Sequence, residues 1–303
     1  MKRTEPFEFY QPGSLTEASR LLKENGPGGR FLAGGTDLVI AMKEKGLVPK
    51  YIVDLKRVPG LDQIHENGDG SITLGALTTM YAIETAPLIK KKYPFLAQSA
   101  AEVGSIQIRN RATIGGNMAN ATPSADTAPA LIALDATAKI AGIGGERTIS
   151  LEEFFKGPGQ TVMSSDEILT EITIPKTDPR LVGEYIKFSP REMMDLAYVG
   201  VAVVYNLSEK DKKCDGVRIV LGAVAPTPIR AKRAEAALEG KVLTEGLAEK
   251  AGQIAAEEAK PISDVRSSAD YRRAMVGAMT KRALLNAAGG PAKSWYDRRD
   301  RRY

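Results

Sequence analysis

The stretch RATIGGNMANATPSADTAPALIALDA, residues 111–136, carries the strongest local signal in this chain of 303 residues. Residues 113–126 of this stretch combine a double glycine with short hydroxyl, amide and carboxylate side chains, among them Thr113, Asn117 and Asp126. So many short polar groups do not suit a buried core, and the span is long for a plain turn. We interpret it as a pocket where many donors converge on phosphates and ribose, with Asp126 accepting from a hydroxyl. An alternative, compatible with the first, is that Ser124 and Asp126 cap the helix that follows.

A second stretch, FLAGGTDLVIAMKEKG at residues 31–46, has the same layout of an apolar run, a double glycine, a polar pair and an amphipathic segment. Glycines at positions 34–35 accept positive φ and let a ligand approach the backbone. Thr36 or Asp37 can cap the helix that begins at Leu38, whose free N–H groups favour a phosphate. Taken alone, this loop is more simply a tight turn with no ligand. Taken with the first stretch, it predicts two loops that hold one ligand with two phosphates.

The cysteine and histidine counts limit the metal chemistry of this chain. Its single cysteine, Cys214, excludes an internal disulfide framework and makes the cytosol the expected compartment. A complete iron–sulfur cluster within the chain is excluded, because such clusters need about four cysteine ligands. One cysteine and one histidine, His65, predict no zinc site. No apolar run approaches the roughly 20 residues of a membrane span, and the first residues predict no secretory signal.

The charge distribution argues against a nucleic-acid partner. The net charge is +5, and three of these charges lie in the last thirteen residues, PAKSWYDRRDRRY. The remainder is nearly balanced, whereas nucleic-acid binding usually needs a basic face on the folded domain. We expect this basic tail, residues 291–303, to be a disordered or docking extension, with polyanion binding as the weaker alternative.

Other nucleotide and hydrolase signatures are absent from the sequence. GIGGER at residues 142–147 breaks the dinucleotide fingerprint G-x-G-x-x-G, because Arg147 stands where the last glycine belongs. No G-x-x-x-x-G-K-[ST] segment occurs, so a P-loop nucleotidase is not supported. The only histidine, His65, lies in a polar stretch and predicts a solvated turn rather than a Ser-His-Asp triad.

The chain divides into three structured parts before the tail, at residues 1–57, 58–177 and 178–290. The first part predicts a small α/β unit, with a helix in SLTEASRLLKENG and the order strand, turn, helix, strand from residue 30 onwards. The elements expected in the second part are strands at 71–77, 137–142 and 168–175 and helices at 79–92, 94–103 and 124–136. The alternation of ILTEITIP and its terminal Pro175 predict a strand that runs to a sheet edge.

The third part changes character to a run of strands followed by a run of helices, which predicts a separate α+β domain. Three antiparallel strands are expected, at residues 183–189, 198–207 and 216–226. Three helices follow, at residues 230–239, about 244–259 and about 268–288.

Both loops together resemble the FAD-binding subunit of molybdenum hydroxylases, the family of xanthine, carbon monoxide and nicotinate dehydrogenases. The resemblance is carried by AGGTDL and QIRNRATIGGNMANATPSADTAPALIALDA. It is supported by FEFYQPGSLTEA, EYIKFSPREMMDLAYVGVAVV, GAVAPTPIRA and SSADYRRAMVGAMTKRAL, and so covers residues of about 5 to 288. Only the tail lies outside it.

The resemblance implies an α+β, vanillyl-alcohol-oxidase-like (PCMH-type) FAD-binding fold of two α/β subdomains, plus a C-terminal domain with a three-stranded antiparallel sheet and helices. It places the FAD pyrophosphate between the two glycine loops. No residue need act as a general acid, base or nucleophile. The cofactor-binding residues that it implies are Leu32, Ala33, Gly34, Gly35, Thr36, Asp37, Leu38, Thr113, Ile114, Gly115, Gly116, Asn117, Thr122, Ser124, Asp126, Leu169 and Lys187.

Two side chains near the implied flavin, Lys187 and Tyr198, have alternative roles. Lys187 either places a cation near the flavin or forms a structural salt bridge. A family position that can be aromatic falls near Val103, and Tyr198 either covers the flavin in its place or is an ordinary strand residue. Because His65 lies outside both loops, a covalent link from histidine to FAD is not expected. With Cys214 as its only cysteine, the chain does not fit the 4-hydroxybenzoyl-CoA reductase branch, which carries a cluster loop in this subunit.

The same resemblance implies an oxidoreductase of several subunits. A large partner would hold a molybdenum-pterin cofactor and a small partner two [2Fe–2S] clusters, in a dimer of heterotrimers. This chain would pass electrons through FAD to NAD+, a quinone or another soluble acceptor, in the cytoplasm, with membrane association through partners left open. A stand-alone FAD-dependent oxidoreductase of the same fold is the alternative. A cofactor-free assembly protein is a third reading, against which the intact glycines and Asp126 argue.

Overall fold

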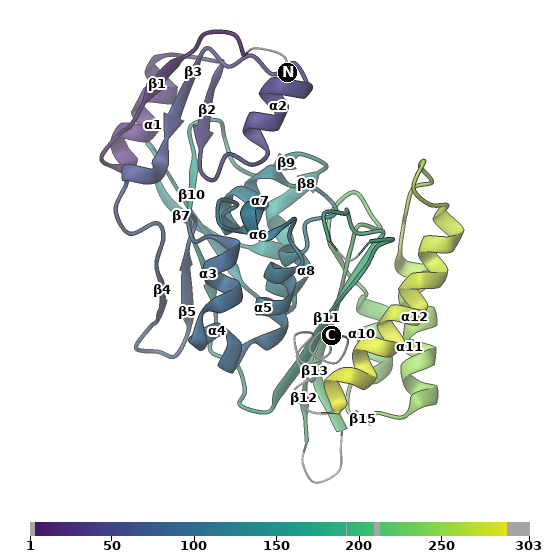
Figure 1. The fold of residues 1–303 in the computed structure, drawn as a ribbon. Helices are drawn as coiled ribbons and strands as arrows, with labels where there is room; N and C mark the ends of the chain where they lie inside the picture. The colour runs from purple at the N-terminus through teal and green to yellow at the C-terminus, as the bar shows by residue number, and fades with distance from the viewer. Residues whose placement is uncertain (1–3, 192, 209–212, 290–303) are drawn as a thin grey trace.

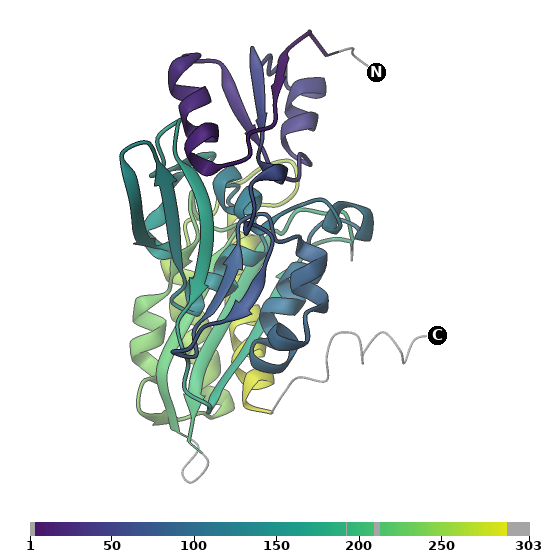
Figure 2. The same cartoon turned by 90° about the vertical axis from the view of Figure 1, so that its left-hand side faces the viewer.

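The computed structural model describes residues 4–191, 193–208 and 213–289. The basic tail expected at 291–303 lies outside the described residues. Along the chain, a small N-terminal unit is followed by a central unit and then by a sheet covered by long helices (Figure 1). Figure 2 shows the N-terminal unit at one end of the molecule, above the other two. Among the described helices, none combines the length and the apolar character needed to cross a membrane.

The N-terminal unit is a parallel sheet with helices in its connections. The strand order is β1 (Glu8–Tyr10), β3 (Tyr51–Asp54) and β2 (Gly29–Leu32). Helix α1 (Leu15–Glu24) links β1 to β2, helix α2 (Leu38–Glu44) links β2 to β3, and a 3₁₀ turn, η1 (Leu55–Arg57), follows. The predicted order of strand, turn, helix and strand is confirmed, and β1 is an addition that sequence periodicity did not indicate.

The central unit is built on an antiparallel sheet of five strands. Their order is β4 (Ile64–Glu66), β5 (Ile72–Gly75), β10 (Ile168–Ile174), β6 (Thr137–Gly142) and β7 (Gly145–Ser150). The expectation that residues 168–175 run to an edge is wrong, because β10 is the middle strand. Pro175 follows the last strand residue and so removes no hydrogen bond from the ladder. His65, expected in a turn, lies exposed in the short strand β4.

Short helices pack on this sheet and carry the polar loops. They are α3 (Met80–Thr85), α4 (Pro87–Lys92), α5 (Pro94–Ala101), α6 (Ile106–Arg109), α7 (Ile114–Asn120), α8 (Thr127–Ala133) and α9 (Leu151–Phe154), followed by the hairpin β8 (Phe155–Gly157) and β9 (Gln160–Thr161). The helix expected at 79–92 is divided at Ala86, since Pro87 starts a new helix and cannot donate a backbone bond to the old one. The helix expected at 124–136 is shorter, and Asp135 beyond it has a φ of 52°.

The C-terminal sheet contains the three predicted strands, β11 (Leu181–Phe188), β12 (Val199–Leu207) and β13 (Lys213–Gly222). Two strands of two residues each, β14 (Ile229–Arg230) and β15 (Lys241–Val242), also pair with β13 and were not predicted. The three predicted helices are confirmed as α10 (Lys232–Leu238), α11 (Glu245–Glu258) and α12 (Ala269–Ala288).

Both faces of this sheet are buried, and the alternation of side chains along β12 shows how. Val201 and Val203 belong to the core that the sheet forms with α10, α11 and α12. Ala202 and Val204 point to the opposite face and belong to the core of the central unit, where α5 and α8 pack. The sheet therefore separates two layers of helices (Figure 1). Through one face it is continuous with the central core, which places β11 close to the polar loop at residues 122–126.

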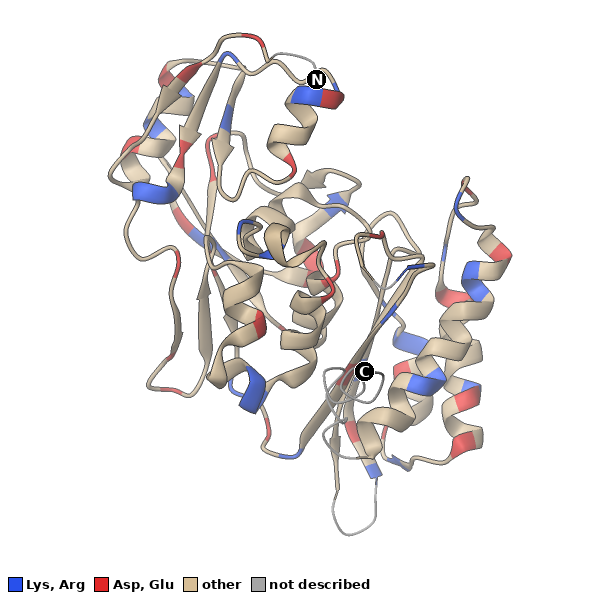
Figure 3. Ribbon diagram, viewed as in Figure 1, with Lys and Arg blue, Asp and Glu red and all other residues tan. Residues whose placement is uncertain are grey.

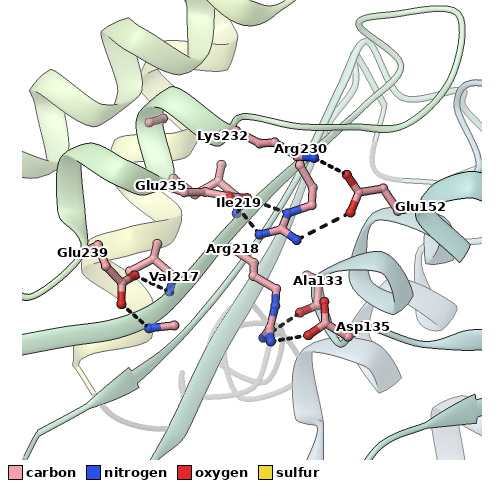
Figure 4. Close-up of polar contacts among 12 residues, drawn as sticks. Ala133, Asp135, Glu152, Val217, Arg218, Ile219, Arg230, Lys232, Glu235 and Glu239 are labelled. Atoms are coloured by element: carbon pink, nitrogen blue, oxygen red, sulfur yellow. Dashed lines mark hydrogen bonds and ion pairs between the residues drawn. The ribbon is translucent and has the colours of Figure 1, made fainter. Parts of the chain in front are cut away.

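Charged side chains reinforce this junction (Figure 4). Arg218 on β13 pairs with Asp135 and donates to the Ala133 carbonyl at the end of α8. Arg230 pairs with Glu235 at 2.8 Å and with Glu152 at 3.5 Å, so it joins the C-terminal helices to α9 of the central unit. Elsewhere, basic and acidic residues are interspersed along the ribbon (Figure 3).

Replacing Arg230 with methionine should lower the free energy of unfolding by about 2 kcal/mol, because it leaves the largely buried Glu235 carboxylate without its cation. Lys232→Met is the matched control, since Lys232 pairs with the same Glu152 at 2.8 Å but its side chain is 68% exposed. That change should cost less than about 1 kcal/mol. Urea unfolding of both variants measures the difference, and equal losses would contradict the role given to Arg230.

Candidate cofactor-binding site

A cavity of about 640 Å³ lies where the N-terminal unit meets the central unit, and both glycine loops line it. Its size is in the range of small-molecule sites in proteins, roughly 300–1,000 Å³. Every predicted site residue lines the cavity except Leu32, Ile114 and Lys187. Leu32 ends strand β2, and Ile114 is fully buried in the central core. The two loops, about eighty residues apart in the sequence, therefore face one space.

The first loop connects β2 to α2 and needs both of its glycines. Gly35 has a φ of +80°, and a Cβ on Gly34 would lie 1.9 Å from the carbonyl oxygen of Arg111. The first helical bond runs from the Val39 N–H to the Gly35 carbonyl at 3.0 Å. The N–H groups of residues 35–38 precede this bond and are not used by the helix, so they remain available to a ligand.

The capping expected from Thr36 or Asp37 is wrong. Asp37 stands at the N-cap of α2, but its side chain makes no capping hydrogen bond. Its φ of −93° and ψ of −43° are helical, whereas a capping side chain normally requires an extended backbone. Both residues line the cavity.

The second loop differs from the first because its backbone N–H groups are engaged by the protein. Ile114 donates to the Thr78 carbonyl at 2.9 Å and Gly115 to the Ala76 carbonyl at 2.8 Å. Gly116 donates to the side chain of Thr113, the N-cap residue of α7, at 3.2 Å. The N–H groups of residues 114–116 are therefore not free to form a backbone cradle. Side chains are the main polar groups that this loop offers to the cavity.

Those side chains are ordered by local hydrogen bonds. Thr127 donates to the amide oxygen of Asn117 at 2.8 Å, which orients the Asn117 NH₂ group. Asn120 donates to Thr122 at 2.9 Å. Asn117, Asn120, Thr122 and Ser124 all line the cavity. These groups match the expectation of short donors that converge on one space.

The glycines of the second loop permit two close contacts. A Cβ on Gly115 would lie 2.5 Å from the Cβ of Ala76, so this glycine lets α7 pack on the end of strand β5. A Cβ on Gly116 would lie 2.8 Å from Thr113 Oγ1 and 3.8 Å from the Cβ of Ala33 in the first loop. Gly116 thus lies where the two loops approach each other.

Asp126 is the buried acidic group of the cavity wall, with 7% of its surface exposed. Tyr185 Oη donates to one carboxylate oxygen at 2.9 Å, and Lys187 Nζ to the other at 3.0 Å. Burial raises the pKa of Asp126, while the Lys187 cation and both hydrogen bonds act to lower it. The side chain of Asp126 makes no capping bond to α8, so the capping alternative is wrong for this residue.

Lys187 forms the structural salt bridge that was its alternative role. Its Nζ also donates to the carbonyl of Glu102 at 2.9 Å, and it does not line the cavity.

Tyr185 was missed by the sequence analysis. Burial, followed by the adjacent Asp126 carboxylate, raises the pKa of its hydroxyl well above the usual value, so it remains a donor. The sequence could have indicated Tyr185, because it lies two residues before Lys187, and this spacing puts both side chains on one face of strand β11.

Apolar groups complete the wall. Leu169 of β10, next to a register irregularity of that strand, and Val103, after α5, both line the cavity. Residues 194–196 of the C-terminal part line it too, and were not predicted. Tyr198 does not line it, because its ring packs against Phe188 and beneath the Arg272 guanidinium, 5.5 Å from the ring centroid.

Comparison with known families identifies the family of this chain. The profile of the family described as "FAD binding domain in molybdopterin dehydrogenase" matches residues 5–177, and that of the "CO dehydrogenase flavoprotein C-terminal domain" matches residues 184–287. This chain is a member of the FAD-binding medium subunits of molybdenum hydroxylases. The family consists of oxidoreductase subunits, and FAD is its cofactor.

Individual relatives match over nearly their whole length. The carbon monoxide dehydrogenase medium chain of Hydrogenophaga pseudoflava is 35% identical over 93% of this chain and 96% of the relative. A putative xanthine dehydrogenase FAD-binding subunit of Escherichia coli is 31% identical over 93% of this chain and 97% of its own. The solved carbon monoxide dehydrogenase of H. pseudoflava has a TM-score of 0.90 and 35% identity, covering 94% of this chain and 98% of the other. The solved quinoline 2-oxidoreductase of Pseudomonas putida 86 has a TM-score of 0.89 and 33% identity, covering 95% of this chain and 99% of the other.

The cavity residues of this chain fit FAD. Unused N–H groups in the first loop suit phosphate oxygens, and the buried carboxylate and short amide and hydroxyl groups of the second suit sugar and ribityl hydroxyls. Glycines 34, 35 and 116 keep side-chain atoms out of the space between the loops. Val103 and Leu169 offer apolar contacts to an aromatic ring system.

Gly34→Ala should lower the free energy of unfolding by about 1–3 kcal/mol, because the new methyl group overlaps the Arg111 carbonyl and forces the two loops apart. Gly144→Ala is the matched control, since a Cβ at that glycine in the β6–β7 turn meets nothing within 4 Å. Its effect should stay within about 0.5 kcal/mol. Thermal and urea unfolding provide the measurement, and a Gly34→Ala protein as stable as the control would refute the close contact.

Proposed function

We propose that this chain transfers electrons within a molybdenum hydroxylase complex, from [2Fe–2S] clusters of a small partner subunit through FAD to NAD+, a quinone or another acceptor. The observation that carries the proposal is that both glycine loops open onto one cavity, with Gly116 facing Ala33. Bound FAD supplies the capacity to take up electrons singly and release them in pairs. The role of the protein is to bind, orient and shield this cofactor.

Each part of the cavity has a separate task in this proposal. The N–H groups at residues 35–38 hold the pyrophosphate. Asp126, kept in place by Tyr185 and Lys187, accepts from a hydroxyl of the cofactor. Leu32 and Ile114 support the loops from behind, since neither lines the cavity. Leu169 and Val103 exclude water from the ring system.

The alternative of a stand-alone flavoenzyme is less well supported by the acidic groups of the cavity. Such an enzyme needs a general acid or base that is free to exchange a proton with its substrate. Of the carboxylates that line the cavity within the described residues, Asp126 pairs with Lys187, Glu167 with Arg147 and Asp195 with Arg191. Asp37 lies in the first loop beside the proposed pyrophosphate site.

The composition of the complex is also part of the proposal. The relatives are named as medium chains or FAD-binding subunits, which supports partners that hold the other redox centres. We propose a large subunit with a molybdenum-pterin cofactor and a small one with two [2Fe–2S] clusters, assembled as a dimer of heterotrimers in the cytoplasm. Cys214, the only cysteine of the chain, is buried, and burial raises the pKa of its thiol to about 11. Cluster ligands must therefore come from another chain.

Gly116→Leu should abolish FAD binding, because its side chain projects into the narrow space beside Ala33, while the C-terminal core stays folded. Flavin absorbance per chain after reconstitution measures binding, and circular dichroism measures folding. Gly144→Leu is the control and should bind FAD normally, since a side chain there points into open space. Stoichiometric flavin in Gly116→Leu would argue strongly against this site.

The same variant tests electron transfer in the assembled complex. With Gly116→Leu in place, substrate should still reduce the partner clusters, but the acceptor should no longer be reduced. Rapid-mixing spectroscopy follows the two signals separately. Unchanged acceptor reduction in the flavin-free complex would remove this chain from the electron path, and substrate turnover by the isolated flavin-loaded chain would favour the stand-alone enzyme.

In the Tyr185→Phe variant, the loss of FAD affinity on acidification should begin at a higher pH than in the wild type. Loss of the Tyr185 hydrogen bond destabilises the Asp126 carboxylate, so the pKa of Asp126 rises. On acidification, Asp126 is then protonated at a higher pH and is no longer a pure hydrogen-bond acceptor. Tyr205→Phe is the control, because Tyr205 is equally buried but donates to the Leu284 carbonyl, away from the cavity. Fluorescence titration of FAD across pH makes the comparison, and identical profiles for wild type and Tyr185→Phe would contradict the role of Asp126.

A further inference from the structure

The segment at residues 102–104, which follows helix α5, is held by its carbonyl groups. The Glu102 carbonyl accepts from Lys187 Nζ at 2.9 Å, and the Val103 carbonyl accepts from Arg109 Nη1 at 3.4 Å. The Gly104 carbonyl accepts from the Met194 N–H at 3.4 Å. Three consecutive carbonyls are thus tied to three different parts of the chain. Val103 and Gly104 also line the cavity, so these bonds fix part of its wall.

The cations in this arrangement are buried and neutralised. Arg109 is 6% exposed, and its Nε donates to a carboxylate oxygen of Glu84 on α3 at 2.7 Å. Lys187 is neutralised in the same way by Asp126. Burying a charged pair is costly, and its replacement by apolar residues is often neutral or stabilising. The Arg109–Glu84 pair therefore needs a reason other than stability alone.

The position of the Val103 carbonyl supplies that reason. Val103 follows Glu102, the C-cap of α5, and belongs to the segment that lines the cavity. A backbone carbonyl that is shielded from water without a partner costs free energy, and an aromatic ring system bound in the cavity would offer it none. Arg109 satisfies this carbonyl from within the protein. Its neighbours Ile108 and Ala112 line the same cavity, so its position also sets theirs.

We propose that Arg109 is a positioning residue for the flavin. Paired with Glu84, it holds the Val103 carbonyl and so keeps the Val103–Gly104 wall at the distance that the ring system requires. This inference rests on the proposed function in one respect, which is that FAD occupies the cavity. Arg109 does not line the cavity and acts only through the wall.

The test is a double variant, Arg109→Met with Glu84→Gln, made in the full-length chain. It removes both charges together, so no unpaired ion is left buried and the protein should fold. We expect the dissociation constant of FAD to rise about tenfold or more, as for the loss of one charge-assisted hydrogen bond. The visible spectrum of the remaining bound flavin should also change, because its surroundings are no longer fixed. Arg109→Lys should keep the pair with Glu84 and most of the stability, but bind FAD nearly as weakly as the double variant.

A matched control separates positioning from stability. Arg230→Met with Glu235→Gln removes another ion pair, one that is largely buried and lies outside the cavity, and FAD affinity should not change. Thermal unfolding of the flavin-free proteins checks that both double variants lose similar stability. Equal FAD affinity and spectra in wild type and the Arg109 double variant would overturn the role of Arg109 alone. A wild-type chain that binds no FAD would overturn the proposed function as well, so the two failures are distinguishable.

Discussion

The close approach of the two polar loops is the constraint on which the rest of the structure depends. Gly34 lies so near the Arg111 carbonyl that no side chain fits between them, and Gly116 faces Ala33 across the remaining gap. This contact joins the N-terminal parallel sheet to the central antiparallel sheet and creates one cavity from two separate turns. Without it, each loop would be an ordinary connection between a strand and a helix.

The loops contribute different chemistry to that cavity. In the first loop, the N–H groups of residues 35–38 are not used by helix α2, because the first helical hydrogen bond is donated by the Val39 N–H. In the second, Ile114 and Gly115 donate to the carbonyls of Thr78 and Ala76, and the polar groups offered to the cavity are mainly side chains. One loop is therefore suited to the pyrophosphate, while the other is suited to hydroxyl groups. A single elongated ligand with both kinds of group satisfies the pair, which is the physical basis for assigning FAD to this cavity.

The C-terminal part takes a direct share in the site. Strand β11 supplies Tyr185 and Lys187 to Asp126, and Lys187 reaches on to the carbonyl at Glu102. Because the other face of the same sheet packs on α10 and α12, these side chains are held by a buried and rigid support. The cavity between the two loops is thus closed by the part of the chain that follows it in sequence. Three segments meet at its wall near residues 102–104.

The sequence by itself determined most helices, the long strands β10–β13 and the two loops, because these depend on periodicity, glycine and short polar side chains that act locally. It did not indicate the short helices α6, α7 and α9. It also indicated that Asp126 matters, through the polar pattern around it, and that Lys187 matters, through resemblance to a family. Only the tertiary structure decided that β10 is a central strand and that Tyr185 and Lys187 both bind Asp126. It also decided that the carbonyls of Thr78 and Ala76 accept from the N–H groups of residues 114 and 115 in the second loop. Each of these joins residues far apart in the chain. Such pairings are set by how the sheets pack against each other, and no local propensity of the residues involved reveals them.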